Sequence, residues 1–176
     1  MNIFFLDRDP KKAARYHCDK HVVKMPLEHC QMLSDAHRYL DGVPRQIMGP
    51  KRQKTVYILQ EDNKENLVYK PFMPHHKCSK WIRKSRDHYN WTFECTKYLI
   101  EELEIRYGTV HKIKKSGLLD ILSNPPQNLF WTGWEDPPHA MPSDCDLTDT
   151  VEAYRSYYRI YKKDFATWKT GEPYWW

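Results

Sequence analysis

The pattern of polar and apolar positions between residues 10 and 40 predicts an amphipathic helix whose polar face is rich in reactive side chains. At 3.6 residues per turn, one narrow stripe collects groups that can transfer protons, act as nucleophiles or bind metals: His17, His21, Lys24, Glu28, Gln31 and Asp35. The apolar residues fall largely on the other side: Val22, Val23, Leu27, Cys30, Leu33 and Leu40. A merely solvated face usually carries long charged residues of mixed sign. The stripe is therefore either such a face with histidines in it by chance, or an active site.

Capping signals and apolar stripes predict the other elements. Asp9 followed by Pro10 is a helix-start signal, and Asp149 with Glu152 forms a capping box. The helices expected from these signals and from the periodicity span residues 10–18, 19–40, 79–107, 116–122 and 149–168. Because Pro26 lies inside the second of these, we expect a kink or a break just before it.

Residues 43–76 show the least regular pattern. Two short apolar runs, 55–59 and 67–69, are separated by a polar segment and predict either a β-hairpin or a helical turn. We therefore predict one mainly α-helical domain over residues 1–176, with its helices packed through Trp, Tyr and Leu faces. A minor β-hairpin is expected within 55–69.

The formal net charge of the 176-residue chain is +5, from 28 basic and 23 acidic residues. This mild excess suits a protein that contacts polyanions through a local patch. The candidate phosphate contacts are clustered basic residues: Lys51, Arg52 and Lys54 in a loop, Lys77, Lys80, Arg83 and Lys84 at the start of the long helix, and Arg155 and Arg159 on the last helix. Trp131 and Trp134, on a proline-rich loop, are candidates for stacking on a base. For the basic clusters, the alternative is an ordinary solvated surface.

No sequence feature predicts export or membrane insertion. The apolar start is interrupted by Asp7, Arg8 and Asp9, and no apolar run approaches the ~20 residues needed to cross a bilayer. The five cysteines are odd in number and show no CxxC pair. We expect a cytoplasmic protein with reduced thiols, no membrane partner and no bound cofactor.

Two chemistries fit the polar stripe. In the first, Glu28 is an acid/base or electrostatic group, and Lys20 or Lys24 is an amine nucleophile. His17 and His21 then serve as proton shuttles or phosphate contacts. In the second chemistry, the two histidines share a metal ion. Its third ligand would come from the next segment: His75, His76 or Cys78.

Two longer motifs frame the chain. The first is Leu6-Asp7-x-Asp9-Pro10-x-x-Ala13-Ala14-Arg15-Tyr16-His17-Cys18-Asp19-Lys20-His21-Val22-Val23-Lys24-Met25-x-Leu27-Glu28-x-x-Gln31-Met32-Leu33. The second runs from Met141-Pro142 through Glu152-Ala-Tyr-Arg-Ser-Tyr-Tyr158 to Phe165-Ala166-x-Trp168. Both motifs resemble a family of small proteins from phages and bacteria. Some members are similar, more remotely, to pyrimidine-dimer DNA glycosylases of the phage endonuclease V type, through an Asp-Lys dipeptide, a Lys and a Glu leading into Gln-x-Leu.

This resemblance implies an all-α, helix-packed DNA repair protein that cleaves a glycosidic bond. In that enzyme type the nucleophile is the N-terminal α-amine, and the key carboxylate is a helical glutamate, a role that Glu28 matches. The sequence departs at the amine, because Asn2 is bulky enough for Met1 to be retained. Lys20 or Lys24 would then replace the α-amine, or the activity would differ.

We therefore expect an enzyme that acts on DNA or on a nucleobase, with DNA as its partner. We expect His17, Lys24 and Glu28 to converge on one concave, partly solvent-accessible active site. Two alternatives remain open. One is a non-catalytic phage accessory protein that binds nucleic acid or a host protein, and the other is a metal-dependent hydrolase that uses His17 and His21.

Overall fold

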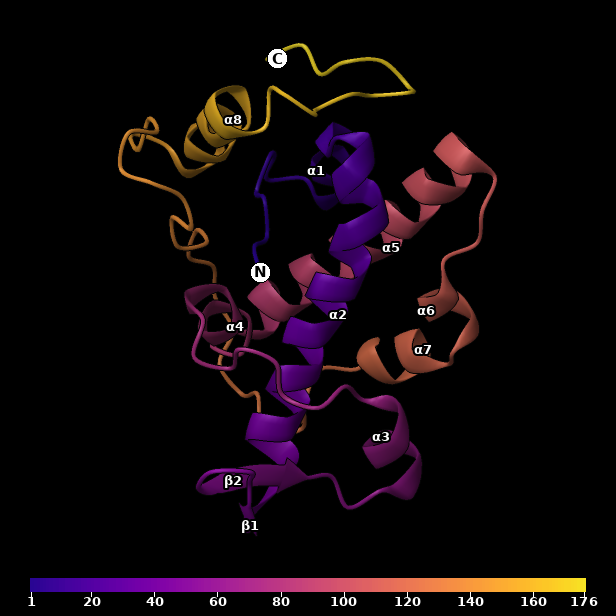
Figure 1. The fold of residues 1–176 in the computed structure, drawn as a ribbon, viewed down its shortest axis with the longest axis vertical. Helices are drawn as coiled ribbons and strands as arrows, with labels where there is room; N and C mark the ends of the chain where they lie inside the picture. Colours follow the sequence, from indigo (N-terminus) through magenta and orange to yellow (C-terminus); the bar gives the residue numbers. More distant parts are fainter.

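Two long helices form the centre of the computed structural model, which describes residues 1–176 (Figure 1). Helix α2, Asp19–Asp41, packs against α5, Arg86–Tyr107, and the short α1, Pro10–Tyr16, also packs against α5. The shorter elements surround this pair: α3 (Asp62–Leu67), α4 (Lys77–Ile82), α6 (Lys112–Lys115), α7 (Leu118–Leu122) and α8 (Thr150–Tyr161). The helices contain 48% of the residues, which confirms the prediction of a mainly α-helical fold. None of them is both long enough and apolar enough to span a membrane.

The N-terminal segment runs through the interior of the protein. Ile3, Phe5 and Leu6 are completely buried and belong to a hydrophobic cluster of 33 residues. Phe4 stacks on His21 of α2, with ring centroids 4.4 Å apart, and meets Tyr158 of α8 edge-on at 5.3 Å. The segment is thus held between α2 and α8, and this packing fixes the position of the residues before it.

Helix α2 continues through Pro26, so of the kink or break expected there, the break does not occur. A proline in a helix removes the hydrogen bond to the carbonyl four residues earlier, here that of Val22. The rest of the backbone ladder continues to Asp41, and the proline ring is buried. Packing of the buried face therefore outweighs the local preference of one residue.

The helix predicted over 79–107 is in fact two helices, α4 and α5, with a turn at residues 83–85. The Ser85 hydroxyl caps α5 by accepting a hydrogen bond from the backbone N–H of Asp87 at 3.2 Å. A serine that favours this capping geometry interrupts the apolar stripe that suggested one continuous helix. Gly108 ends α5 in the left-handed conformation, with φ +63°, which residues with a Cβ rarely adopt.

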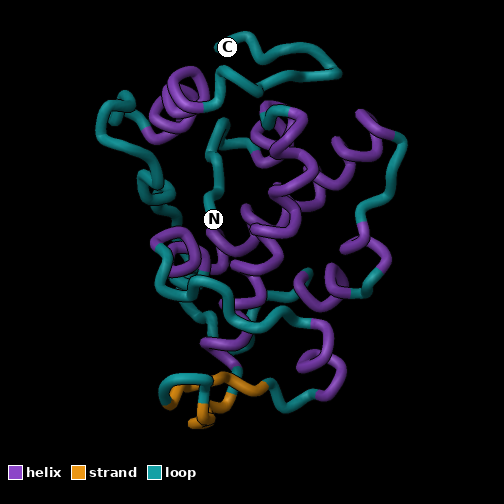
Figure 2. Tube along the Cα trace, in the orientation of Figure 1, coloured by secondary structure: helices purple, strands orange, loops and turns teal.

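The β-hairpin lies earlier in the chain than predicted. Strand β1, Val43–Met48, pairs antiparallel with β2, Gln53–Ile58, whereas residues 62–67 form α3 (Figure 2). Arg38 explains the difference, because its buried guanidinium donates hydrogen bonds to the Tyr57 and Val68 carbonyls and to the Glu65 carboxylate. This tertiary contact fixes the segment after β2 as a helix beside α2.

The chain after α8 folds back onto the beginning of α2, so the last helix ends at Tyr161 rather than at 168. Asp19 holds this tail. Its carboxylate accepts hydrogen bonds from the Thr167 hydroxyl at 3.1 Å and from the Lys169 backbone N–H, and it also pairs with Arg106 at 3.1 Å. The Trp168 indole N–H donates to the Tyr16 carbonyl at 3.0 Å. Residues 162–176 are therefore irregular but packed.

Candidate functional site

Glu28, near the middle of α2, lies between two amines. Its Oε1 atom is 2.9 Å from the Nζ atom of Lys24, one helical turn earlier. Its Oε2 atom is 3.6 Å from the α-amino nitrogen of Met1, and it also accepts a hydrogen bond from the backbone N–H of Asn2 at 3.1 Å. The Glu28 side chain is only 12% exposed. A carboxylate with little contact with water is thus surrounded by three N–H groups.

The sequence positions the α-amino group through the buried N-terminal segment. The Asn2 side-chain oxygen accepts hydrogen bonds from the backbone N–H groups of Ile3 and Phe4, at 2.7 and 3.0 Å. Its side-chain amide donates to the Ala140 carbonyl at 2.9 Å. The Met1 side chain is itself buried. Both sides of the amine are therefore anchored, which restricts its movement relative to Glu28.

Helix α4 and the residues around position 139 form the neighbouring surface. The Ser79 hydroxyl donates to the Met1 sulfur at 3.4 Å, so the first turn of α4 lies directly against Met1. Lys77 at the start of the same helix donates to the His139 carbonyl. The surroundings of the carboxylate therefore combine two segments far apart in the sequence with the middle of α2.

His76 precedes α4 and is the titratable side chain coupled to this cluster. Burial lowers its pKa, and the positive charges of the Met1 amine and Lys77 lower it further. The imidazole is therefore neutral near pH 7. Its Nδ1 atom accepts a hydrogen bond from the Cys78 backbone N–H at 3.2 Å, so in the neutral ring the proton resides on Nε2.

The two lysines proposed as nucleophiles lie in different surroundings. Lys24 contacts Glu28, but its side chain is 64% exposed. Lys20 is also exposed, and its Nζ atom lies 4.5 Å from the centre of the Phe165 ring without pairing with Glu28. The structure therefore brings Lys24, but not Lys20, to the carboxylate.

His17 and His21 do not face solvent, contrary to the expectation of an accessible site with His17, Lys24 and Glu28. His17 is completely buried, with Nδ1 2.7 Å from the Ala13 carbonyl oxygen, and His21 contacts the Tyr158 hydroxyl. Burial lowers the pKa of each to about 3, so both are neutral at pH 7. Neither supplies positive charge for a phosphate.

The basic residues predicted to contact nucleic acid divide into two groups. The exposed ones that make no ion pair are Lys51, Arg52, Lys54, Lys77 and Lys80, and of these Lys77 donates a hydrogen bond to the His139 carbonyl. The others are engaged within the protein: Arg83 with the Pro74 carbonyl, Lys84 with Glu135, Arg155 with the Leu6 carbonyl and Asp7, and Arg159 with Glu152. Arg155 therefore joins α8 to the N-terminal segment, and Arg159, which also donates to the Trp175 carbonyl at 3.2 Å, joins it to the C-terminal tail.

The two loop tryptophans also divide. Trp134 is packed between Trp81 and Trp91 and donates its indole N–H to Asp136 at 2.9 Å, although its side chain is partly exposed. Trp131 is 45% exposed, and the Lys84 amine lies 5.6 Å from the centre of its ring. The two side chains are exposed to nearly the same extent, 45% for Trp131 and 41% for Trp134, and they differ in that Trp134 packs against two other tryptophans.

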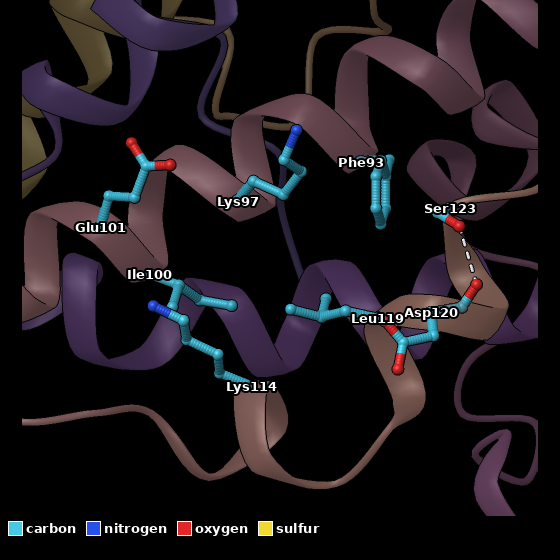
Figure 3. Close-up of a pocket in the computed structure, with 8 residues that line it drawn as sticks. All are labelled: Phe93, Lys97, Ile100, Glu101, Lys114, Leu119, Asp120 and Ser123. Carbon is cyan, nitrogen blue, oxygen red and sulfur yellow. Dashed lines mark hydrogen bonds between the residues drawn. The ribbon is translucent and has the colours of Figure 1, made fainter.

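Five cavities of about 310 to 560 Å³ are lined by other residues, and among the residues around Glu28 only Lys24 borders one of them. The smallest, of about 310 Å³, lies between α5 and the α6–α7 segment (Figure 3). Phe93, Lys97 and Glu101 line it from α5, and Leu119 and Asp120 line it from α7. The pocket expected around His17, Lys24 and Glu28 is not among these five.

The metal-dependent alternative lacks a ligand set. No group of three or more His, Cys, Asp or Glu side chains is arranged to hold a metal ion. His17 and His21 contact a carbonyl and a hydroxyl instead, and the first turn of α4 engages His76 in capping.

Comparisons of the chain with protein-family models, with curated proteins and with solved structures gave no match. The resemblance suggested by the opening and closing motifs therefore stays a prediction. Any functional argument must start from the arrangement around Glu28.

The sequence pattern identified Glu28 and Lys24 but not the α-amino group of Met1 or His76 as their neighbours. The sequence does contain a pattern that predicts burial of the segment next to the Met1 amine. The apolar run Ile3–Leu6 next to a helix with an apolar face implies that the segment is buried on that helix. Which turn of α2 it reaches depends on the Asn2 contacts, which no local pattern reveals.

Proposed function

We propose that this protein is a DNA glycosylase or lyase in which an amine beside Glu28 attacks a deoxyribose. The observation that carries the proposal is the contact of one poorly exposed carboxylate with two primary amines, at 3.6 Å for the Met1 α-amino group and 2.9 Å for Lys24. An amine next to a carboxylate can form a covalent intermediate while the carboxylate accepts or returns a proton.

In the proposed reaction the amine nitrogen forms a bond to C1′ of the sugar, and the bond from C1′ to the base breaks. The electron pair of that bond leaves with the base, which takes up a proton from water. Glu28 accepts a proton from the amine nitrogen once that nitrogen is bonded to C1′, and it returns the proton to O4′ when the sugar ring opens. Ring opening produces a protonated imine, whose positive charge the Glu28 carboxylate then stabilises. A free abasic sugar reaches the same imine when its C1′ aldehyde reacts with the amine and releases water.

We assign the nucleophile to the Met1 α-amine rather than to Lys24. As a class, α-amino groups are less basic than lysine side chains, which favours an α-amine as a nucleophile near neutral pH. The α-amine is also anchored by the buried Met1 side chain and by Asn2, while Lys24 is 64% exposed. Positioning lowers the entropic cost of reaching the reactive geometry.

Borohydride trapping tests the proposal, because it reduces the imine to a stable amine and leaves protein and DNA covalently joined. Wild-type protein is first checked by intact mass for a free α-amine on Met1. It is then incubated with an abasic duplex and borohydride, and peptide mass spectrometry locates the attachment. We expect an adduct on Met1 that persists in Lys24→Ala and Lys20→Ala and disappears after transamination of the α-amine to a carbonyl.

Three outcomes would contradict parts of this assignment. An adduct on Lys24 that Lys24→Ala abolishes would transfer the nucleophile to the lysine but keep the reaction. An adduct spread over many exposed lysines would indicate non-specific chemistry. No adduct with any damaged or abasic substrate would remove the glycosylase or lyase activity and favour the non-catalytic binding protein.

A further inference from the structure

The positive charge of the protein is concentrated in two segments without a single acidic residue, 42–59 and 67–86. Together they contain ten basic residues: Arg45, Lys51, Arg52, Lys54, Lys70, Lys77, Lys80, Arg83, Lys84 and Arg86. The rest of the chain keeps 18 of the 28 basic residues and all 23 acidic ones, a net charge of −5. The net charge of +5 therefore understates how strongly this part of the protein attracts polyanions.

The first segment forms an exposed hairpin, which we call the basic hairpin and define as residues 43–58. It projects at the end of the molecule opposite α8 (Figure 1). All six residues of β1 are exposed, as are Lys51 and Arg52 in its turn, and its four basic residues make no ion pair. The Gly49 N–H closes the turn by donating to the Arg52 carbonyl at 2.9 Å. A two-stranded ribbon without internal charge neutralisation is thus presented to solvent.

The second segment connects the basic hairpin to the amine site. In the first turn of α4, Ser79 contacts Met1. Just after the end of α4, the Arg83 guanidinium lies 4.5 Å from the centre of the Tyr39 ring of α2, and Tyr39 packs on Tyr57 of β2 with ring centroids 4.4 Å apart. Helix α4 therefore touches the site in its first turn, and the residue after it is linked to the base of the hairpin through Tyr39; the helix itself carries Lys77 and Lys80.

The length of α2 sets the distance between the two regions. Glu28 and Asp41 are 13 positions apart in this helix, which corresponds to about 20 Å at a rise of about 1.5 Å per residue. Strand β1 begins at Val43, just after the helix. Phosphates repeat about every 3.4 Å along one DNA strand, so about 20 Å corresponds to roughly six nucleotides.

We propose that the basic hairpin and α4 form a track for double-stranded DNA, with the hairpin on the duplex roughly six base pairs from the sugar that reacts at Glu28. The position of the reacting sugar rests on the proposed function, whereas binding of the duplex to the hairpin does not. A two-stranded ribbon fits the major groove, which is about 12 Å wide, and its unpaired cations match the phosphates on either side.

Anisotropy of a labelled 20-base-pair duplex tests binding as salt is increased. The test variant neutralises the hairpin through Arg45→Gln, Lys51→Gln, Arg52→Gln and Lys54→Gln. The matched control removes four exposed lysines that make no ion pair and lie outside both segments, through Lys12→Gln, Lys112→Gln, Lys115→Gln and Lys163→Gln. We expect the hairpin variant to bind at least tenfold more weakly, with a log–log salt slope less negative by about 3 to 4, and the control to keep most of the slope.

Footprinting of an abasic duplex by hydroxyl radicals tests the spacing. Wild-type protein should protect the abasic site and a second region about six nucleotides away, and the hairpin variant should lose only the second. Equal weakening by both variants, or unchanged binding of the hairpin variant, would overturn the proposal. Equal loss of affinity for single-stranded DNA or RNA would overturn the assignment to a duplex.

A short substrate separates this proposal from the proposed reaction. An abasic single strand of five nucleotides is too short to span both regions, so borohydride should trap it equally with wild type and with the hairpin variant. If no substrate is trapped but the anisotropy results are as expected, the chemistry is wrong and the duplex track stands. If trapping succeeds and the hairpin variant binds duplex normally, the proposed chemistry stands and the duplex track is wrong.

Discussion

Helix α2 carries two carboxylates that lie against cationic groups, Asp19 in its first turn and Glu28 near its middle. The partners of Asp19 are a buried guanidinium, a hydroxyl and a backbone N–H. Arg106 also donates to Glu102 and to two backbone carbonyls, and its side chain is completely buried. These groups are fixed in place by several hydrogen bonds each, so the Asp19 cluster holds segments of the protein together.

The partners of Glu28 are different in kind. The Met1 α-amine and the Lys24 side chain are both primary amines. Each keeps N–H groups, or a lone pair when deprotonated, that Glu28 does not occupy, and the Lys24 side chain is mostly exposed. A primary amine can become a nucleophile, whereas a guanidinium stays protonated at all accessible pH values. Burial of a carboxylate beside a cation is therefore insufficient to identify a reactive site. What distinguishes a reactive site is whether the cation is a primary amine or a guanidinium, and how many other hydrogen bonds hold that cation in place.

Replacement of Glu28 by glutamine should give the largest effect. The amide keeps the size of the side chain and an oxygen acceptor for Asn2, so the fold should survive, but it cannot take a proton from the amine. We expect the rate of borohydride trapping and of turnover to fall by about 10²–10⁴-fold. Circular dichroism supplies the folding control, and an unchanged rate in a folded variant would exclude Glu28 from the reaction.

Replacement of Asp19 by alanine should instead affect stability. Arg106 would keep its buried charge without its partner, and the tail would lose its anchor at Thr167 and Lys169. We expect the free energy of unfolding in urea to decrease by about 3–5 kcal/mol. Asp19→Asn retains acceptors and should lose less. If the trapping rate per folded molecule of Asp19→Ala fell as much as that of Glu28→Gln, the assignment of a structural role to Asp19 and a chemical role to Glu28 would be contradicted.

Acidification should destabilise the protein through buried histidines. Burial lowers the pKa values of His17 and His21 to about 3 and those of His29 and His37 to about 4, from 6.5 in the unfolded chain. Their stabilising effect is present above pH 6.5 and is lost as the pH falls toward these values. Each contributes a slope of about 1.4 kcal/mol per pH unit within that window.

Asp35 opposes the histidines, because burial raises its pKa to about 7 from 3.8. Its contribution is fully present below pH 3.8 and is lost as the pH rises through 7. Four histidines outweigh one aspartate, so urea unfolding should show stability falling between pH 6.5 and 4.5. Asp35→Asn should steepen this fall by about 1.4 kcal/mol per pH unit. A free energy of unfolding that does not change between pH 6.5 and 4.5 would contradict the lowered pKa values of the four buried histidines.

Lys24 should contribute least to stability. Its ion pair with Glu28 spans one helical turn, but the lysine is 64% exposed, so solvent screens most of the attraction. We expect Lys24→Met to change the free energy of unfolding by at most about 0.5 kcal/mol. A loss of several kcal/mol would show that Lys24 is as structural as Arg106 and would blur the contrast between the two clusters.

The helical periodicity and the capping residues were sufficient to predict α1, α2, α7 and the beginning of α8. Asp9 and Asp149 cap helices because their side chains accept nearby backbone N–H groups, an interaction determined within a few residues. The hairpin lies earlier than the local pattern predicts, because Arg38 and Glu65 fix the following segment through a contact between distant positions. Local patterns contain no information on such pairs.

The polar stripe on α2 was a partial guide to the candidate site. It selected Glu28 and Lys24, which do lie together, and it included His17 and His21 because a continuous helix would place all four on one face, whereas His17 lies between α1 and α2 with an extended backbone. The N-terminal segment covers the first part of that face and leaves the second part next to its own amine. Periodicity gives the face of a helix but not the segment that packs on it.

The interior position of the N-terminal segment has a consequence for the order in which the protein can form during translation. Asn2 is held by Ala140, 138 positions later, and Asp19 is held by Thr167, 148 positions later. Contacts of such sequence separation form late and slow folding, because a long loop must close first. We therefore expect the amine to settle beside Glu28 only after most of the chain has left the ribosome; under the proposed function, a nascent chain with a folded basic hairpin would contact DNA before it could react with it.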